Sequence, residues 1–186
     1  MQLVFNRMKK IIVFALFIVI ARFASIAETS YPDSLVTDTC LQQHMEMIDS
    51  VIVYAKNYIG VPYKYGGKEG KGFDCSGFVH FVFEPWGYNL PYSSRGYGDY
   101  GSEVELSEVR PGDFVLFKGR NATSTGIGHV ALVIDVDEDG QVYIIHATIH
   151  KGITIDNMSN QNYYITRYLQ VRRMPMPCEL SDAIVD

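Results

Sequence analysis

The pattern of apolar positions predicts helices in the first half of the chain and strands in the second half. From Met45 to Ile59, apolar residues recur every three or four positions, which is the period of an amphipathic helix. Gly60 and Pro62 end this helix. Residues 28–47 are mixed and polar and have no sustained apolar period, so we interpret them as a lead-in segment.

A glycine-rich stretch and a second helix come next. Gly66 to Gly72 predicts a loop, because glycines cluster there between two periodic segments. Phe73–Phe83 predicts a helix that begins at Asp74 or a neighbouring cap residue and ends before Pro85.

The second half of the chain predicts an antiparallel sheet. Residues 84–110 are rich in Gly, Pro, Tyr and Ser, which is typical of a long surface connection. Asp139 and Gly140 form a turn dipeptide that joins two β-branched runs into a hairpin. Helices followed by antiparallel strands indicate the α+β class. The predicted strands are 114–117, 129–136, 142–147, 152–155 and 168–172.

The first 27 residues have the features of a secretory signal peptide. Three basic residues precede an apolar run from Ile11 to Ala21, which is too short to cross a bilayer about 30 Å thick. Small residues at its end predict cleavage after Ala27, so the mature chain begins at Glu28 and has no integral membrane segment. An uncleaved N-terminal anchor is the alternative. We therefore expect an exported protein in the periplasm, in the cell envelope or outside a bacterium.

Composition and charge restrict the class of protein. The 186 residues are 47% hydrophobic and 20% charged, which predicts one globular domain. The net charge is -5, and removal of the basic signal makes the mature chain more acidic. This sign argues against binding to nucleic acid or anionic lipid.

Three cysteines remain after cleavage: Cys40, Cys75 and Cys178. An odd number in an oxidising compartment leaves at least one thiol unpaired. Cys40 and Cys178 could form a bridge between the two ends of the domain, or both could be free thiols.

Cys75 is the candidate nucleophile. It lies in the sequence GFDCSGF, between the glycine loop and the second predicted helix. At a helix N-terminus, the partial positive charge and the free backbone N–H groups stabilise a thiolate and a developing oxyanion. A buried structural cysteine is the alternative.

Two histidines could complete this chemistry. His129 begins a predicted strand after two glycines, where it could act as the general base, and His146 lies on the paired strand, where it could orient that base. A zinc site of Cys75, His129 and His146 is the competing interpretation, but the chain lacks the paired CxxC cysteines typical of zinc sites. The other three histidines are interpreted as surface or helix-face residues: His44, His80 and His150.

Six motifs follow one another in the order IGVPYKYGG, FDCSGFV, LPYSS, VRPGDFVLF, GHVALVID and VYIIHAT. Together they resemble the NlpC/P60 family of cell-wall cysteine peptidases over residues 49–172. The resemblance implies a papain-like α+β fold with N-terminal helices packed on a central antiparallel sheet. It places the catalytic domain at 48–174 and a C-terminal tail at 175–186. It also implies that Cys75 is the nucleophile, His129 the base and His146 the orienting residue.

The resemblance assigns three further site residues. Tyr63 matches a tyrosine whose hydroxyl lies near the nucleophile and shapes the oxyanion region. Asp74 and Ser76 match positions that contact the free amino end of a stem peptide. No metal and no other cofactor is implied.

The function implied is hydrolysis of the amide between γ-D-glutamyl and a diamino acid in peptidoglycan stem peptides or muropeptides, in wall remodelling or recycling. An amidase or acyltransferase on the same fold is one alternative, since fold alone does not determine the substrate. A wall-binding module that is not catalytic is the other.

Overall fold

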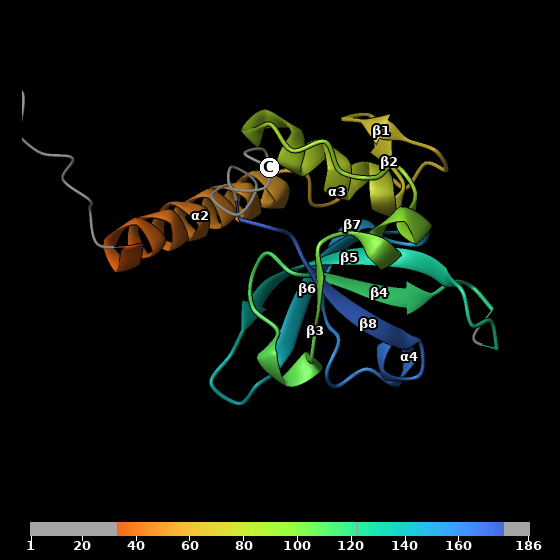
Figure 1. The fold of residues 1–186 in the computed structure, drawn as a ribbon. Helices are drawn as coiled ribbons and strands as arrows, with labels where there is room; N and C mark the ends of the chain where they lie inside the picture. The colour runs from red at the N-terminus through yellow and green to blue at the C-terminus, as the bar shows by residue number, and fades with distance from the viewer. Residues whose placement is uncertain (1–32, 122, 177–186) are drawn as a thin grey trace, which may run out of the picture. The chain divides into compact units, whose positions relative to one another are not determined.

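The computed structural model describes residues 33–121 and 123–176 (Figure 1). Residues 39–176 belong to one compact unit, and residues 33–38 are the start of the first helix. The expected signal peptide 1–27, the cleavage site before Glu28, Cys178 and most of the tail 175–186 lie outside the described residues.

The first helix, α2 (Asp33–Lys56), is longer than the sequence pattern predicts. The predicted start at Met45 is therefore too late, because the helix already includes most of the segment 28–47 that we interpreted as a lead-in. Apolar periodicity does not reveal these turns, because side chains such as Gln42 and Gln43 are exposed. Once the packed turns have formed, each further helical residue adds a hydrogen bond without a new nucleation cost. The predicted end is close to the observed one, and Gly60 adopts a φ of +88° beyond it.

The glycine-rich stretch contains a small hairpin, formed by β1 (Lys68–Glu69) and β2 (Gly72–Phe73). The predicted second helix is α3 (Cys75–Phe83), and a short 3₁₀ turn, η1 (Glu84–Trp86), follows it. The helix thus begins directly after Asp74, as predicted.

The sheet has six antiparallel strands in the order β3-β8-β4-β5-β6-β7. All five predicted strands are present, so the α+β prediction is confirmed. Strand β3 and the short helix α4 were not predicted, because each has four residues or fewer and no clear period. The elements of this half are β3 (Ser102–Val104), β4 (Phe114–Lys118), β5 (Ile127–Val136), β6 (Val142–Thr148), β7 (Gly152–Asn157), α4 (Asn162–Ile165) and β8 (Tyr168–Arg173).

The two faces of the sheet bury different apolar clusters. On one face, Leu116 and Leu132 pack in the cluster that contains α2 and α3 side chains. On the other, Phe117 and Val133 pack with Tyr164 of α4. Figure 1 shows α3 beside the sheet, where it packs against β5 and β6. Within the described ranges, no helix has the length and apolar character needed to span a membrane.

Candidate active site

The side chain of Asp74 caps the N-terminus of α3. Its Oδ1 accepts hydrogen bonds from the Gly77 backbone N–H at 2.7 Å and from the Ser76 hydroxyl at 3.1 Å. Its Oδ2 accepts from the Gly66 N–H at 3.0 Å. The carboxylate therefore caps the helix and ties the glycine loop to its first turn.

Two glycines let the loop lie against the helix. The Asp74 N–H donates to the Gly67 carbonyl at 3.1 Å. A Cβ added at Gly77 would overlap the Gly67 carbonyl oxygen, which is rigid backbone. A side chain at position 77 would push the loop away from the residue before Cys75.

Cys75 is a buried free thiol at the first position of α3. The backbone N–H groups of Val130 and Ser76 face its sulfur and act to lower the pKa, but burial is the larger effect and raises the pKa of the thiol. The helix-terminal position predicted from sequence is correct. The expected net stabilisation of the thiolate is not found, because the sulfur lies within the apolar cluster.

The predicted pair of histidines is present. His129 Nε2 and His146 Nδ1 are 2.7 Å apart. The register explains the contact: Leu132 pairs with Ile145, so His129 lies diagonally across from His146 on the same face of the hairpin. Among the described hydrogen bonds, none joins His129 to the Cys75 sulfur; the sulfur instead lies at the backbone of Val130, the next residue along β5.

This arrangement disfavours the zinc alternative. Two nitrogens bound to one tetrahedral zinc at about 2.0–2.1 Å lie roughly 3.3 Å apart. The nitrogens of His129 and His146 are closer and face each other, as hydrogen-bond partners do. Across 33–121 and 123–176, no three His, Cys, Asp or Glu side chains are grouped as a metal site.

Three residues beyond His146 extend the polar cluster. His146 Nε2 lies 3.1 Å from Asp156 Oδ2 on β7 and 3.2 Å from the hydroxyl of Tyr164 on α4. That hydroxyl donates to the same Asp156 oxygen at 2.6 Å, and the Lys151 ammonium donates to the other oxygen at 3.1 Å. Sequence analysis did not find Asp156, Tyr164 or Lys151, because they carry no motif. Only the alternation of β7 opposite β6 could have pointed to Asp156.

The protonation preferences of this cluster have clear causes. Burial, and then the neighbouring His146, lowers the pKa of His129. Hydrogen bonds from His146, Tyr164 and Lys151 hold the pKa of Asp156 well below its usual range. These shifts favour a neutral His129, a neutral Cys75 thiol and an ionised Asp156.

A model of the NlpC/P60 family matches residues 60–173, which include the α3 start and both histidine strands. The chain belongs to the NlpC/P60 family. The resemblance inferred from the six motifs is thereby confirmed.

Curated relatives and solved structures of this family match the same region. The chain is 37% identical over 125 residues to a gamma-DL-glutamyl hydrolase of Bacillus subtilis (strain 168), covering 67% of this chain and 29% of that protein. It is 36% identical over 135 residues to the murein DD-endopeptidase MepS/murein LD-carboxypeptidase of Escherichia coli (strain K12), covering 72% and 66%. An NlpC/P60 family protein of Bacillus cereus has a similar structure, with a TM-score of 0.61, 31% identity, and coverage of 69% of this chain and 40% of that one.

The three residues assigned by family resemblance lie around Cys75. Tyr63 forms an isolated parallel β-bridge with Phe73. Burial, and then the neighbouring Cys75 and Asp74, raise the pKa of the Tyr63 hydroxyl. The Ser76 hydroxyl is also 2.9 Å from the Tyr92 carbonyl, and both Asp74 oxygens already accept hydrogen bonds. Asp74 and Ser76 thus have structural partners in this NlpC/P60 domain before any substrate arrives.

His80 is buried rather than on the surface. Its Nδ1 lies 2.6 Å from the Leu90 carbonyl, and its ring stacks on Tyr92 with centroids 3.8 Å apart. The Lys68 ammonium covers the same Tyr92 ring at 3.6 Å. Burial follows from α3 itself, whose residues are nearly all enclosed. His80 therefore holds the LPYSS segment against α3, next to Ser76.

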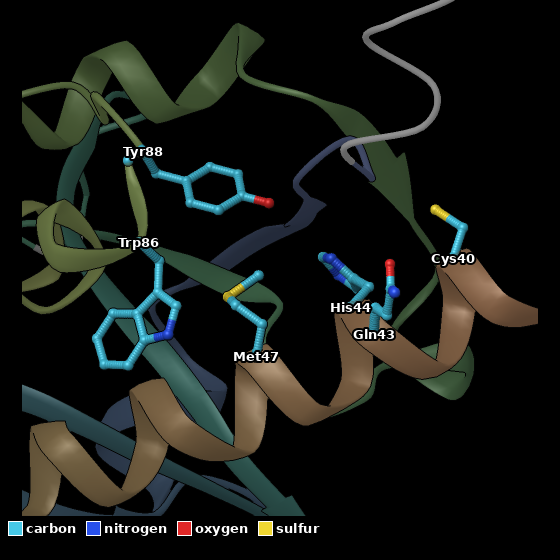
Figure 2. Close-up of a pocket in the computed structure, with 7 residues that line it drawn as sticks. Cys40, Gln43, His44, Met47, Trp86 and Tyr88 are labelled. Carbon is cyan, nitrogen blue, oxygen red and sulfur yellow. The ribbon is translucent and has the colours of Figure 1, made fainter.

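A separate pocket of about 340 Å³ lies between α2 and the turn after α3 (Figure 2). Trp86 and Tyr88 face it from the turn, and His44, which is also buried rather than on the surface, faces it from α2. Cys40, at the same pocket, is disulfide-bonded, which leaves Cys75 as the free thiol among the described cysteines. None of the six site residues lines this pocket.

Proposed function

We propose that the chain is an exported cysteine peptidase that hydrolyses the amide between γ-D-glutamyl and a diamino acid in peptidoglycan stem peptides. One observation carries the proposal: Cys75 begins α3 at the backbone of Val130, and the adjacent His129 is hydrogen-bonded to His146. The names of the relatives, a gamma-DL-glutamyl hydrolase and a murein endopeptidase, support the substrate class.

The first chemical step forms a thioester. His129 Nε2 faces His146, so Nδ1 is the nitrogen that accepts the Cys75 proton. The thiolate adds to the γ-carbonyl carbon of the D-glutamyl residue, and the carbonyl π electrons move to its oxygen. The C–N bond then breaks, and the amine of the diamino acid leaves with the proton from His129.

Backbone N–H groups at the start of α3 suit the developing oxyanion, because they are fixed donors and carry the positive end of the helix dipole. In the second step His129 takes a proton from water. The hydroxide adds to the thioester carbon, the C–S bond breaks, and Cys75 leaves as the thiolate, which recovers the proton. No cofactor takes part in this proposal.

A cut between two stem peptides is the second candidate. The Escherichia coli relative is named a DD-endopeptidase, and the chain covers more of that relative than of the Bacillus subtilis hydrolase. The two bonds release products of different mass, so one digestion separates them.

The test is mass spectrometry of purified muropeptides after digestion, with the Cys75→Ala variant as the control. We expect the wild type to release fragments ending in γ-D-glutamate and the variant to release none. Activity that survives in a folded Cys75→Ala variant would overturn the thiol mechanism. Release of intact single stems from cross-linked dimers would overturn the γ-D-glutamyl assignment in favour of the DD bond.

A further inference from the structure

We propose that Asp156 is a positioning residue that sets the tautomers of both histidines and so leaves His129 Nδ1 unprotonated for Cys75. This inference deepens the proposed function, on which it rests. It is carried by the hydrogen-bond geometry of four side chains on β5, β6, β7 and α4.

The donor and acceptor roles start at Asp156. An ionised carboxylate has no proton to give, so Oδ2 accepts both of its contacts. The single proton of the Tyr164 hydroxyl is used for Oδ2 at 2.6 Å. His146 Nε2, at 3.1 Å from that oxygen and 3.2 Å from the hydroxyl oxygen, therefore faces two acceptors and carries a proton.

The same reasoning passes from His146 to His129. In this proposal His146 carries only the proton on Nε2, so its Nδ1 accepts from His129 Nε2, 2.7 Å away. His129 must then carry its proton on Nε2. Its Nδ1 is left with a lone pair, which is the form a general base needs.

An orienting histidine needs this help more than an amide would. A neutral imidazole can place its proton on either nitrogen, so His146 alone does not choose the tautomer of His129. An asparagine or glutamine has a carbonyl oxygen that only accepts. Asp156 removes the ambiguity, which is the role that second-layer carboxylates have toward metal-binding histidines.

The groups that face Asp156 hold it ionised. These are His146 from β6, Tyr164 from α4 and the Lys151 ammonium from the β6–β7 turn. Asp156 is itself buried, while the Lys151 side chain is 62% exposed. Oδ2 is thus enclosed by His146 and Tyr164, and Oδ1 is paired with a cation that is itself exposed to solvent.

Substitution Asp156→Asn is the direct test. An amide can turn its NH₂ group toward His146 Nε2, which favours a proton on His146 Nδ1 and, in turn, on His129 Nδ1. We expect kcat on muropeptides to fall about 10–100-fold, with KM within about twofold. Asp137→Asn is the matched control, since Asp137 also accepts from a tyrosine hydroxyl, Tyr143 at 3.2 Å, but outside this cluster. It should retain wild-type kcat.

A double-mutant cycle separates positioning from a structural role. In a His146→Asn background the orienting group has no tautomers, so Asp156→Asn should cost less than about threefold. His146→Asn alone should cost less than His146→Ala, because only Asn retains an acceptor for His129. An equal loss from Asp156→Asn in both backgrounds would overturn the proposal.

Long-range proton–nitrogen NMR of the histidine rings gives a readout that needs no catalysis, and on the wild type it needs no variant. The wild type should have both rings protonated on Nε2, and Asp156→Asn should shift protons to Nδ1. A wild-type His146 protonated on Nδ1 would overturn the tautomer assignment. If no muropeptide is cut but the tautomers are as expected, the proposed function fails and the role of Asp156 stands.

Discussion

The Cys75 sulfur lies at the backbone of Val130, the residue that follows His129, and the chain holds Cys75 and His129 in place by different means. The Cys75 side is held by contacts between residues close in sequence: the Asp74 cap, the Gly66 N–H and the Gly67 carbonyl. The His129 side is held by a row of side chains from three strands and a helix, which ends at an ionised carboxylate.

The two sets of contacts control different properties of the site. The contacts around Asp74 fix the backbone that carries Cys75, and none of them involves its sulfur. The histidine side fixes protonation as well as position, because each hydrogen bond there determines which atom holds the proton. A change in the contacts that hold Cys75 should therefore alter mainly stability, and a change in the contacts that hold His129 should alter mainly the rate.

The largest expected effect on rate comes from removing the reacting side chains themselves. Cys75→Ala and His129→Ala should each lower kcat on muropeptides by roughly 10³-fold or more, since nucleophile and base act as one unit. The double variant should be no worse than the poorer single variant. Single-turnover assays of the three proteins measure this.

Additive losses in that series would contradict a joint action of the two residues. Circular dichroism should be the same for all three variants. Loss of the native spectrum in His129→Ala would contradict the comparison, because it would show that the strand side also stabilises the fold.

A smaller effect is expected on the helix side. Gly77→Ala should reduce the free energy of unfolding by about 1–3 kcal/mol, because the added Cβ overlaps the Gly67 carbonyl and the loop must move. Gly70→Ala, in the turn between β1 and β2, is the control: its added Cβ would find its nearest neighbour 3.9 Å away, on Tyr58. Urea denaturation compares the two. Equal stability of both variants would show that the loop is not held by the close approach.

The smallest effect is a difference between the two sides in pH dependence. The pKa of His129 is lowered on folding, so its contribution is full above the unfolded value of about 6.5 and is lost as pH falls below it. The pKa of Cys75 is raised, so its contribution is full below the unfolded value of about 8.5 and is lost as pH rises. Stability should be greatest between these values.

The fall in stability at low pH (the acid limb) should depend on His129, and the fall at high pH (the alkaline limb) should depend on Cys75. His129→Gln should flatten the acid limb of the stability curve and Cys75→Ala the alkaline limb, when unfolding free energies are compared from pH 5 to 10. An acid limb that persists in His129→Gln would assign it to another group instead.

The sequence predicted the helix side well, because a cap residue, glycines and a helix pattern are local signals. It also predicted the pairing of His129 with His146, since the Asp139-Gly140 turn sets the register of one hairpin. The sequence did not predict the roles of Asp156 and Tyr164, because their partners become neighbours only when β7 and α4 pack against β6. The sequence also did not predict the first turns of α2, because an exposed stretch of helix has no apolar periodicity.

The position of β8 has a consequence for the order of folding. It is the last described strand along the chain, yet it lies between β3 and β4 in the sheet. Strands β4 to β7 can pair with near neighbours in sequence, whereas β3 has no partner until β8 has been made and inserted beside it. Such distant pairing slows folding. A nascent chain that ends before Tyr168 would therefore hold the nucleophile, both histidines and the carboxylate, but on a sheet whose edge at β4 is still open.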